Sequence, residues 1–277
     1  MRLQTILKAI LILFVALLCP LYGHSQTLRG DFNMDGRVSL NDVTSMINYM
    51  LTDSPGEATT ADRDTITVNG VPFVMIRVQG GTYNREVLGT GQTVETYSMS
   101  QTEVTVAQWL TVMDTLPRGN GAGPSQLPVV NASWNLCQEF ISRLNAVTGQ
   151  NFRLPTMIEW EYAACGGRLT RGYRYAGSDN LDEVGWYIEN HSSNPHVIGD
   201  VGKLNPNELG LYDMSGNVAE WCQDIIFYDS DGNPFYCARG GTAFADEKDC
   251  RVTTMPLAKY QSDADTPIGL NGFRLAW

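Results

Sequence analysis

The chain has 277 residues, of which 43% are hydrophobic and 18% are charged, a balance typical of a folded globular protein and not of a disordered one. This length is enough for one large domain and a small additional unit. The net charge of -11 at pH 7 argues against a nucleic-acid partner, because phosphate binding requires clustered Lys and Arg, and it fits an exported or calcium-binding protein.

Residues 1–25 have the pattern of a signal peptide. Arg2 and Lys8 give the positive start, residues 9–18 form an apolar run, and small residues follow at 23–25. The apolar run is too short for a comfortable membrane span. We therefore expect an exported protein without a membrane span after cleavage, located in the periplasm, on the cell surface or in the medium.

The cysteines left after cleavage number five: Cys137, Cys165, Cys222, Cys237 and Cys250. An odd number in an oxidising compartment leaves at least one free thiol or an intermolecular bond. No pair has C-x-x-C spacing, which argues against a structural zinc site.

Residues 26–52 predict a small calcium-binding unit. Oxygen-bearing side chains recur at positions one, three, five, nine and twelve of the loop 31–42, a glycine occupies the sharp turn, and an apolar helical face follows. The predicted ligands are Asp31, Asn33, Asp35, Arg37, Ser39 and Asp42. Arg37 would contribute its backbone carbonyl, and Ser39 would act through a water molecule. An Asp at position twelve resembles a dockerin repeat. A full dockerin has two repeats and binds a cohesin, so the single repeat here argues against a cohesin-like partner.

Residues 53–65 are polar with Pro and Gly, and predict a linker to a large domain at 66–277. That domain opens with a strand-rich segment ending at Gly80-Gly81. Three amphipathic helices follow: one around Val106–Met113, one after the N-cap Ser133 that ends at Gly149, and one that starts with a capping box at Thr156 and Glu159. Residues 168–277 predict loops and short strands.

Several segments of the large domain resemble the formylglycine-generating enzyme / sulfatase-modifying factor family, and they recur in family order. They are Gln101-Thr102-Glu103-Val104-Thr105, Phe152-Arg153-Leu154-Pro155-Thr156, Gly210-Leu211-Tyr212-Asp213, Gly216-Asn217-Val218-Ala219-Glu220-Trp221, Arg239-Gly240-Gly241-Thr242 and Gly272-Phe273-Arg274-Leu275. The resemblance implies an α+β, C-type-lectin-like fold, rich in loops, with short strands and about three helices.

Within this domain, Arg153, Glu159, Glu161, Glu220 and Arg274 predict paired charges that clamp a loop-rich fold. The segment around Asn217 also resembles a calcium loop of the family, in which Asn217 and Glu220 offer side-chain oxygens and Val218 a carbonyl.

The family's oxidase uses copper and two cysteines after its Gly-Gly-Ser. Here Cys250 matches the second cysteine, Ala245 stands in place of the first, and Thr242 replaces the serine. A monovalent copper ion requires two thiolates, so these departures argue against copper and against catalysis. For Cys250 we expect instead a structural disulfide, with Cys222 as the candidate partner.

Three functions remain open from the sequence. The preferred one is a calcium-stapled, non-catalytic module that recognises a protein or a glycan. The second is a formylglycine-generating oxidase or a related oxidoreductase with an altered site. The third is a dockerin-mediated component of a polysaccharide-degrading surface assembly.

Overall fold

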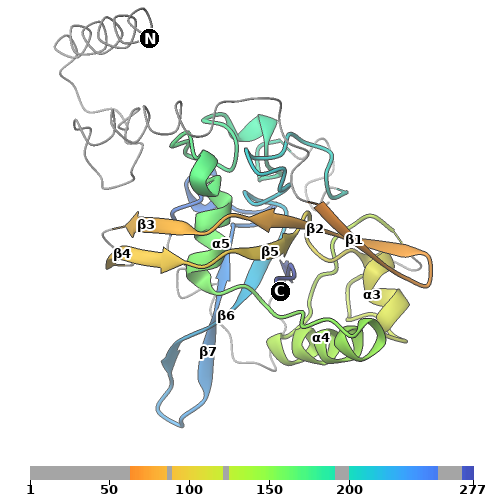
Figure 1. Cartoon of the computed structure of the whole chain (residues 1–277). Coiled ribbons are helices and arrows are strands. Elements are labelled where there is room, and N and C mark those ends of the chain that lie inside the picture. Colours follow the sequence, from red (N-terminus) through yellow and green to blue (C-terminus); the bar gives the residue numbers. More distant parts are fainter. Residues whose placement is uncertain (1–62, 86–88, 121–124, 191–199, 255–269) are drawn as a thin grey trace, which may run out of the picture.

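The computed structural model describes residues 63–85, 89–120, 125–190, 200–254 and 270–277 (Figure 1). The predicted signal peptide at 1–25, the calcium loop at 31–42 and most of the linker lie outside the described residues. The predicted ligands Asp31, Asn33, Asp35, Arg37, Ser39 and Asp42 therefore stay a prediction.

The described chain opens with a three-stranded antiparallel sheet in the order β1-β2-β5. Its strands are β1 (Arg63–Val68), β2 (Val71–Val78) and β5 (Tyr97–Ser100). Asn69 and Gly70 both have positive φ angles, of 48° and 82°, so the two-residue turn between β1 and β2 can match the twist of the strands. Since Arg63 pairs with Ile76, the sheet begins three residues before the predicted domain start at 66.

A second antiparallel pair, β3 (Gly81–Arg85) and β4 (Gly89–Val94), continues from this sheet. The helices that follow are α3 (Val106–Val112), α4 (Trp134–Thr148) and α5 (Met157–Ala164). Each helix begins with an N-cap side chain. The caps predicted for α4 and α5 are formed: Ser133 accepts a hydrogen bond from the Leu136 amide, and Thr156 makes a capping box. Thr105 makes a further capping box at the start of α3. Gly149, with a φ of 70°, ends α4 in the left-handed conformation, which confirms the predicted stop.

The C-terminal half forms a three-stranded sheet in the order β7-β6-β8. Its strands are β6 (Ala219–Tyr228), β7 (Pro234–Arg239) and β8 (Asn271–Gly272). With 10 residues, β6 is longer than the short strands that the sequence predicts. The β6–β7 hairpin extends away from the rest of the domain (Figure 1). The described residues also contain three short 3-10 helices: Gly167–Leu169, Leu181–Glu183 and Glu247–Cys250.

Three clusters of buried side chains form the core. The first core lies between the opening sheet and helices α3 and α4, where Trp109 stacks on Phe140 with ring centroids 5.2 Å apart. The second core surrounds Trp160 of α5. The third, which we call the small core, contains Tyr175, Leu181, Val184, Tyr187, Ala245 and Cys250.

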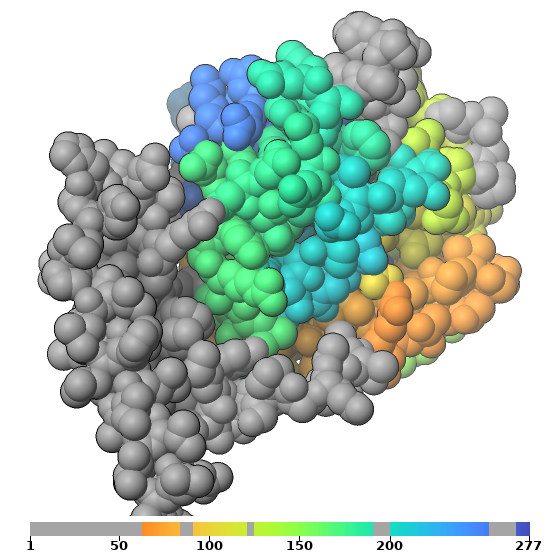
Figure 2. All heavy atoms as spheres, turned by 90° about the horizontal axis from the view of Figure 1, so that it is seen from above, coloured from red at the N-terminus to blue at the C-terminus, as the bar shows by residue number. Residues whose placement is uncertain are grey.

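The loop 200–215 packs against the segment that contains α5. Figure 2 shows the green surface of that segment beside the cyan surface of the loop, and the Asn207 side chain donates to the Ala163 carbonyl at 2.8 Å. None of the helices in the described part of the chain has the length and apolarity that a membrane span needs.

Candidate functional site

The loop after β7 contains the residues that match the family's catalytic positions. Gly240 and Gly241 have φ angles of 99° and 81°, a conformation that L side chains rarely adopt. A Cβ atom on Gly241 would lie 2.9 Å from the Cys250 Sγ, closer than real Cβ contacts. The two glycines therefore allow the chain to fold back so that Cys250 lies directly against the Gly-Gly turn.

Ala245 and Cys250, the two positions that match the family's cysteines, both lie in the small core. Cys250 is fully buried and Ala245 is 5% exposed, so a methyl group stands where a second thiol would be needed. The Cys250 thiol donates to the Thr242 carbonyl over 3.9 Å. Burial, followed by the nearby Asp249 carboxylate, raises the pKa of Cys250 to about 12. The thiol is therefore neutral at physiological pH.

No group of three or more His, Cys, Asp or Glu side chains in the described ranges is arranged to hold a metal ion. A soft monovalent copper ion would have one neutral sulfur at this place, Cys250, and soft metals are held by thiolates. The residues present therefore do not fit the copper site of the oxidase.

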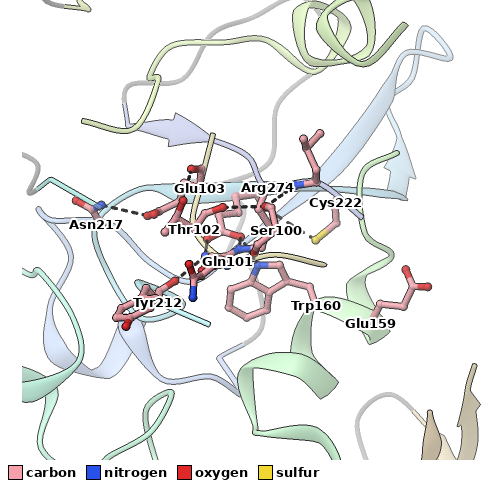
Figure 3. A network of polar contacts seen from close by, with 12 residues as sticks. Ser100, Gln101, Thr102, Glu103, Glu159, Trp160, Tyr212, Asn217, Cys222 and Arg274 are labelled. Carbon is pink, nitrogen blue, oxygen red and sulfur yellow. Dashed lines mark hydrogen bonds and ion pairs between the residues drawn. The ribbon is translucent and has the colours of Figure 1, made fainter. Parts of the chain in front are cut away.

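A buried ion pair stands at the centre of the polar network in Figure 3. Arg274 donates to both oxygens of Glu220 at 2.6 Å, and the Trp160 indole donates to the same carboxylate at 2.6 Å. Arg274 also donates to the carbonyls of Ser100 and Tyr212. These contacts join β5, α5, β6 and the C-terminal segment, as the predicted paired charges require.

A second buried pair, Glu161 and Arg239, connects α5 to β7. Arg239 donates to Glu161, whose other oxygen accepts from the Tyr83 hydroxyl at 2.5 Å. Arg153 and Glu159, two of the charges that the sequence predicts to be paired, also contact each other, with two contacts of 2.6 Å. The charges of this domain are therefore used to connect loops and helices.

Two further buried carboxylates, Glu103 and Asp213, lie beside this network. Glu103 accepts from the Asn217 amide at 3.1 Å, and Asp213 accepts from the Gly202 backbone amide at 2.7 Å. The other oxygen of each, Glu103 Oε2 and Asp213 Oδ1, is buried without a hydrogen-bond partner in the described part of the chain. Burial, Asp213 and Glu220 together raise the pKa of Glu103 well above its usual range, and burial raises the pKa of Asp213 to about 6.

The predicted calcium-loop residues Asn217, Val218 and Glu220 are all buried. The structure directs Glu220 toward Arg274 and Trp160, so both of its oxygens are already engaged. Asn217, with a φ of 56°, points toward Glu103 (Figure 3). Calcium ligation by these three residues stays a prediction, and the sequence analysis did not name Glu103 and Asp213, the carboxylates that each have a buried oxygen without a hydrogen-bond partner in the described residues. Glu103 could have been noticed as an acid inside a family motif directly after a strand.

The predicted disulfide between Cys222 and Cys250 is absent from the structure, in which all five cysteines of the described residues, Cys237 included, have free thiols. Cys222 packs in the second core, where it interacts with Cys237, whereas Cys250 packs in the small core. The pairing inferred from the odd cysteine count therefore differs from the neighbours that the fold provides.

Within the described residues, the outer half of β6 carries four consecutive exposed apolar side chains. They are Ile225, Ile226, Phe227 and Tyr228, which are 40%, 37%, 43% and 61% exposed. Phe227 stacks on Phe235 of β7 with ring centroids 4.5 Å apart. We refer to these four residues as the hairpin patch. Consecutive exposed apolar residues on a projecting hairpin are typical of a contact surface.

Comparisons with known proteins connect this geometry to one family. The model of the sulfatase-modifying factor enzyme 1-like domain matches residues 52–277 and leaves residues 1–51 outside. The chain is 31% identical to the chaperone protein LppX of Paenibacillus barcinonensis over 212 residues, which are 59% of this chain and 72% of LppX. It is 36% identical to the formylglycine-generating enzyme of Streptomyces coelicolor over 188 residues, 57% of this chain and 55% of that enzyme.

A third relative is the inactive C-alpha-formylglycine-generating enzyme 2 of Bos taurus, 30% identical over 115 residues, which are 38% of this chain and 36% of the relative. Among solved structures, Treponema denticola variable protein 1 superposes with a TM-score of 0.63 and 26% identity, and covers 78% of this chain and 99% of its own. PvdO from Pseudomonas aeruginosa, at 19% identity and a TM-score of 0.60, shares the fold over 79% of this chain and 99% of its own.

Proposed function

The chain belongs to the sulfatase-modifying factor enzyme 1-like domain family, and from this premise we propose that it is an exported, non-catalytic member that recognises another molecule, a protein in preference to a glycan. One observation carries the proposal: Ala245 faces a single buried, neutral thiol, Cys250, at the place where the family's oxidase has two cysteines. An oxidase built on two thiolates cannot operate with one neutral sulfur.

The relatives support the same direction. One is named an inactive formylglycine-generating enzyme and another a chaperone, so the family domain occurs in proteins that are not named as active oxidases. The chaperone relative, of which this chain covers 72%, favours a protein as the ligand. The hairpin patch is the contact surface of this proposal, because its apolar side chains are exposed on a projecting ribbon that an unfolded or extended polypeptide can reach.

A copper and peptide assay tests the loss of catalysis. The purified full chain is loaded with monovalent copper and incubated with oxygen and a cysteine-containing sulfatase peptide, while mass spectrometry follows conversion of the cysteine to the aldehyde. We expect no stoichiometric copper retained on sulfur and no aldehyde. Aldehyde formation by the wild type would overturn the proposal in favour of the alternative, an oxidase with an altered site, which the similarity to the Streptomyces coelicolor enzyme keeps open.

An aggregation assay tests the hairpin patch. The full chain is added to thermally unfolding citrate synthase, and light scattering reports aggregation. The double variant Phe227→Ser, Tyr228→Ser removes two exposed aromatic groups, and Val147→Ser, at a position on α4 that is 66% exposed, is the matched control. We expect suppression of scattering by the wild type and the control and its loss in the double variant. Equal suppression by all three proteins would exclude the patch.

We further propose that calcium staples this domain. Glu103 and Asp213 offer hard oxygens that are buried without partners in the described residues, and Asn217 lies next to Glu103, so these groups fit the ligand preference of calcium. A bound divalent cation would neutralise two carboxylates that otherwise repel each other. It acts here as a structural group and supplies no reaction chemistry.

We expect the midpoint of thermal unfolding to be higher in millimolar CaCl2 than in EDTA, because an ion that binds only the folded state stabilises it. In a protein that begins after residue 52, this difference reports on the large domain alone, without the predicted loop at 31–42. Glu103→Gln keeps the hydrogen bond to Asn217 but removes the charge, so we expect the calcium effect to disappear. A midpoint indifferent to calcium in the wild type would refute this part of the proposal.

A further inference from the structure

Two buried cysteines lie opposite each other at the base of the β6–β7 hairpin. The antiparallel register pairs Glu220 with Arg239 and Trp221 with Ala238, and continuing this register by one step brings Cys222 opposite Cys237. From this register and from the complete burial of both side chains, we propose that Cys222 and Cys237 are the site of a cross-strand disulfide in the exported protein.

The alternation of side chains along the two strands supports this pairing. Trp221 and Ala238 both face the first core, whereas Cys222 and Cys237 both face the second core. The two thiols are therefore on the same face of the same strand pair, and Cys237 is close enough to contribute to the raised pKa of Cys222. Opposite residues on antiparallel strands have Cβ atoms about 4.5–5.5 Å apart, within small adjustments of the separation that a disulfide needs.

Other cysteines are placed less favourably. Cys137 lies on α4 in the first core, and Cys250 lies in the small core, so each belongs to a different cluster from Cys222. Cys165 is half-buried at the edge of the second core, where its thiol lies 3.8 Å from the Tyr83 hydroxyl. One pair and three separate thiols then account for the odd number of cysteines. This assignment replaces the Cys222–Cys250 pairing.

Formation of the bond is an exchange with a disulfide oxidant such as glutathione disulfide. The Cys222 thiolate attacks one sulfur of the oxidant and releases one glutathione thiolate. The Cys237 thiolate then attacks the Cys222 sulfur of the mixed disulfide and releases the second glutathione. Two protein thiols lose two electrons and two protons, and one disulfide of the oxidant is reduced to two thiols.

The surroundings of Cys222 influence the timing of this reaction. Burial and the neighbouring Cys237 raise the pKa of Cys222, and the Arg239 guanidinium opposes this effect. Since both thiols are completely buried in the folded chain, the exchange takes place while the strands are still exposed, during folding after export. A chain that has already folded in the reduced state should oxidise slowly.

The disulfide would fix the hairpin at a defined point. Pairing of β6 with β7 is regular up to Trp221 and is interrupted by register shifts between Trp221 and Ile225 and between Ile225 and Phe227. A bond at Cys222 therefore lies at the boundary between the buried base and the irregular, exposed half that contains the hairpin patch. It would hold the register there, independently of what the patch binds.

Peptide mapping of the wild-type chain tests the proposal. The full chain is refolded from denaturant in a glutathione redox buffer, alkylated in denaturant without reductant, and digested. We expect one cross-linked peptide that joins residues 222 and 237 and disappears on reduction. The reduced protein should unfold roughly 5–10 °C lower than the oxidised one, because the bond closes a loop of about 15 residues.

The variants Cys222→Ser and Cys237→Ser separate the outcomes. Each should abolish the cross-link and leave the other residue open to alkylation in denaturant, whereas the matched control Cys137→Ser should retain the cross-link. Complete alkylation of Cys222 and Cys237 in the wild type without reductant, or a cross-link between Cys222 and Cys250, would overturn the proposal.

Discussion

Alkylation of the folded protein should leave Cys250 unmodified under conditions in which an ordinary thiol reacts. Burial and Asp249 raise the pKa of Cys250 from 9.0 to about 12. At pH 8, a shift of about 3 units reduces the thiolate fraction about 1000-fold, and the thiolate is the species that attacks iodoacetamide. Because the pKa of this acid is raised, the neutral thiol predominates up to pH values near 12; the thiolate fraction rises about tenfold per pH unit below that value and levels off above it.

The assay is a time course of iodoacetamide labelling at pH 8, with tryptic mapping of the Cys250 peptide. The same protein in urea is the reference, since unfolding removes the burial that causes the shift. We expect labelling of the folded protein to be at least about 1000-fold slower than in urea. Labelling of Cys250 in the folded protein at a rate within tenfold of the urea reference would show a reactive thiolate, and would refute the main argument for a non-catalytic site.

Two stability predictions follow from the polar contacts. Arg274→Met leaves the Glu220 carboxylate buried without its cation, so the free energy of unfolding measured in urea should fall by about 3–5 kcal/mol. The control Arg143→Met, at an exposed ion pair with Glu139 on α4, should change this free energy by less than about 1 kcal/mol. Similar losses for both variants would contradict the buried network. Thr156→Ala removes the side chain that caps α5 and should cost about 1 kcal/mol, and an unchanged midpoint would mean that Glu159 alone holds the helix start.

The sequence predicted best those features that depend on neighbouring residues. The starts of α4 and α5 follow from Ser133 and from the Thr156 capping box, and the end of α4 follows from Gly149. Each of these signals acts within one helical turn, so no knowledge of the remaining fold is needed. The expectation of a mixed, loop-rich fold with about three helices was confirmed for the same reason.

Features that depend on contacts between distant segments were predicted less well. The sequence named Cys250 as the candidate disulfide partner of Cys222, but the two lie in different buried clusters, because the spacing of cysteines along the chain does not reveal which strands are adjacent. Cys237, on the strand paired with β6, shares the cluster of Cys222. Glu220 was predicted as a calcium ligand because its loop resembles a family motif, but both of its oxygens accept hydrogen bonds from Arg274, which is 54 residues away. Glu103 was missed because its hydrogen-bond partner Asn217 is 114 residues away, so the sequence does not show that the two side chains meet.

The separation between the stabilising charges and the family's catalytic positions explains how the fold can persist without the oxidase chemistry. The buried pairs Glu220–Arg274 and Glu161–Arg239 connect α5, β6, β7 and the C-terminal segment. Ala245 and Cys250 belong to the small core, to which none of these four charged residues contributes. A cysteine-to-alanine change at position 245 removes a metal ligand but places an apolar side chain in an apolar cluster, so it costs the fold little. The charged pairs therefore stabilise the fold independently of the side chain at position 245.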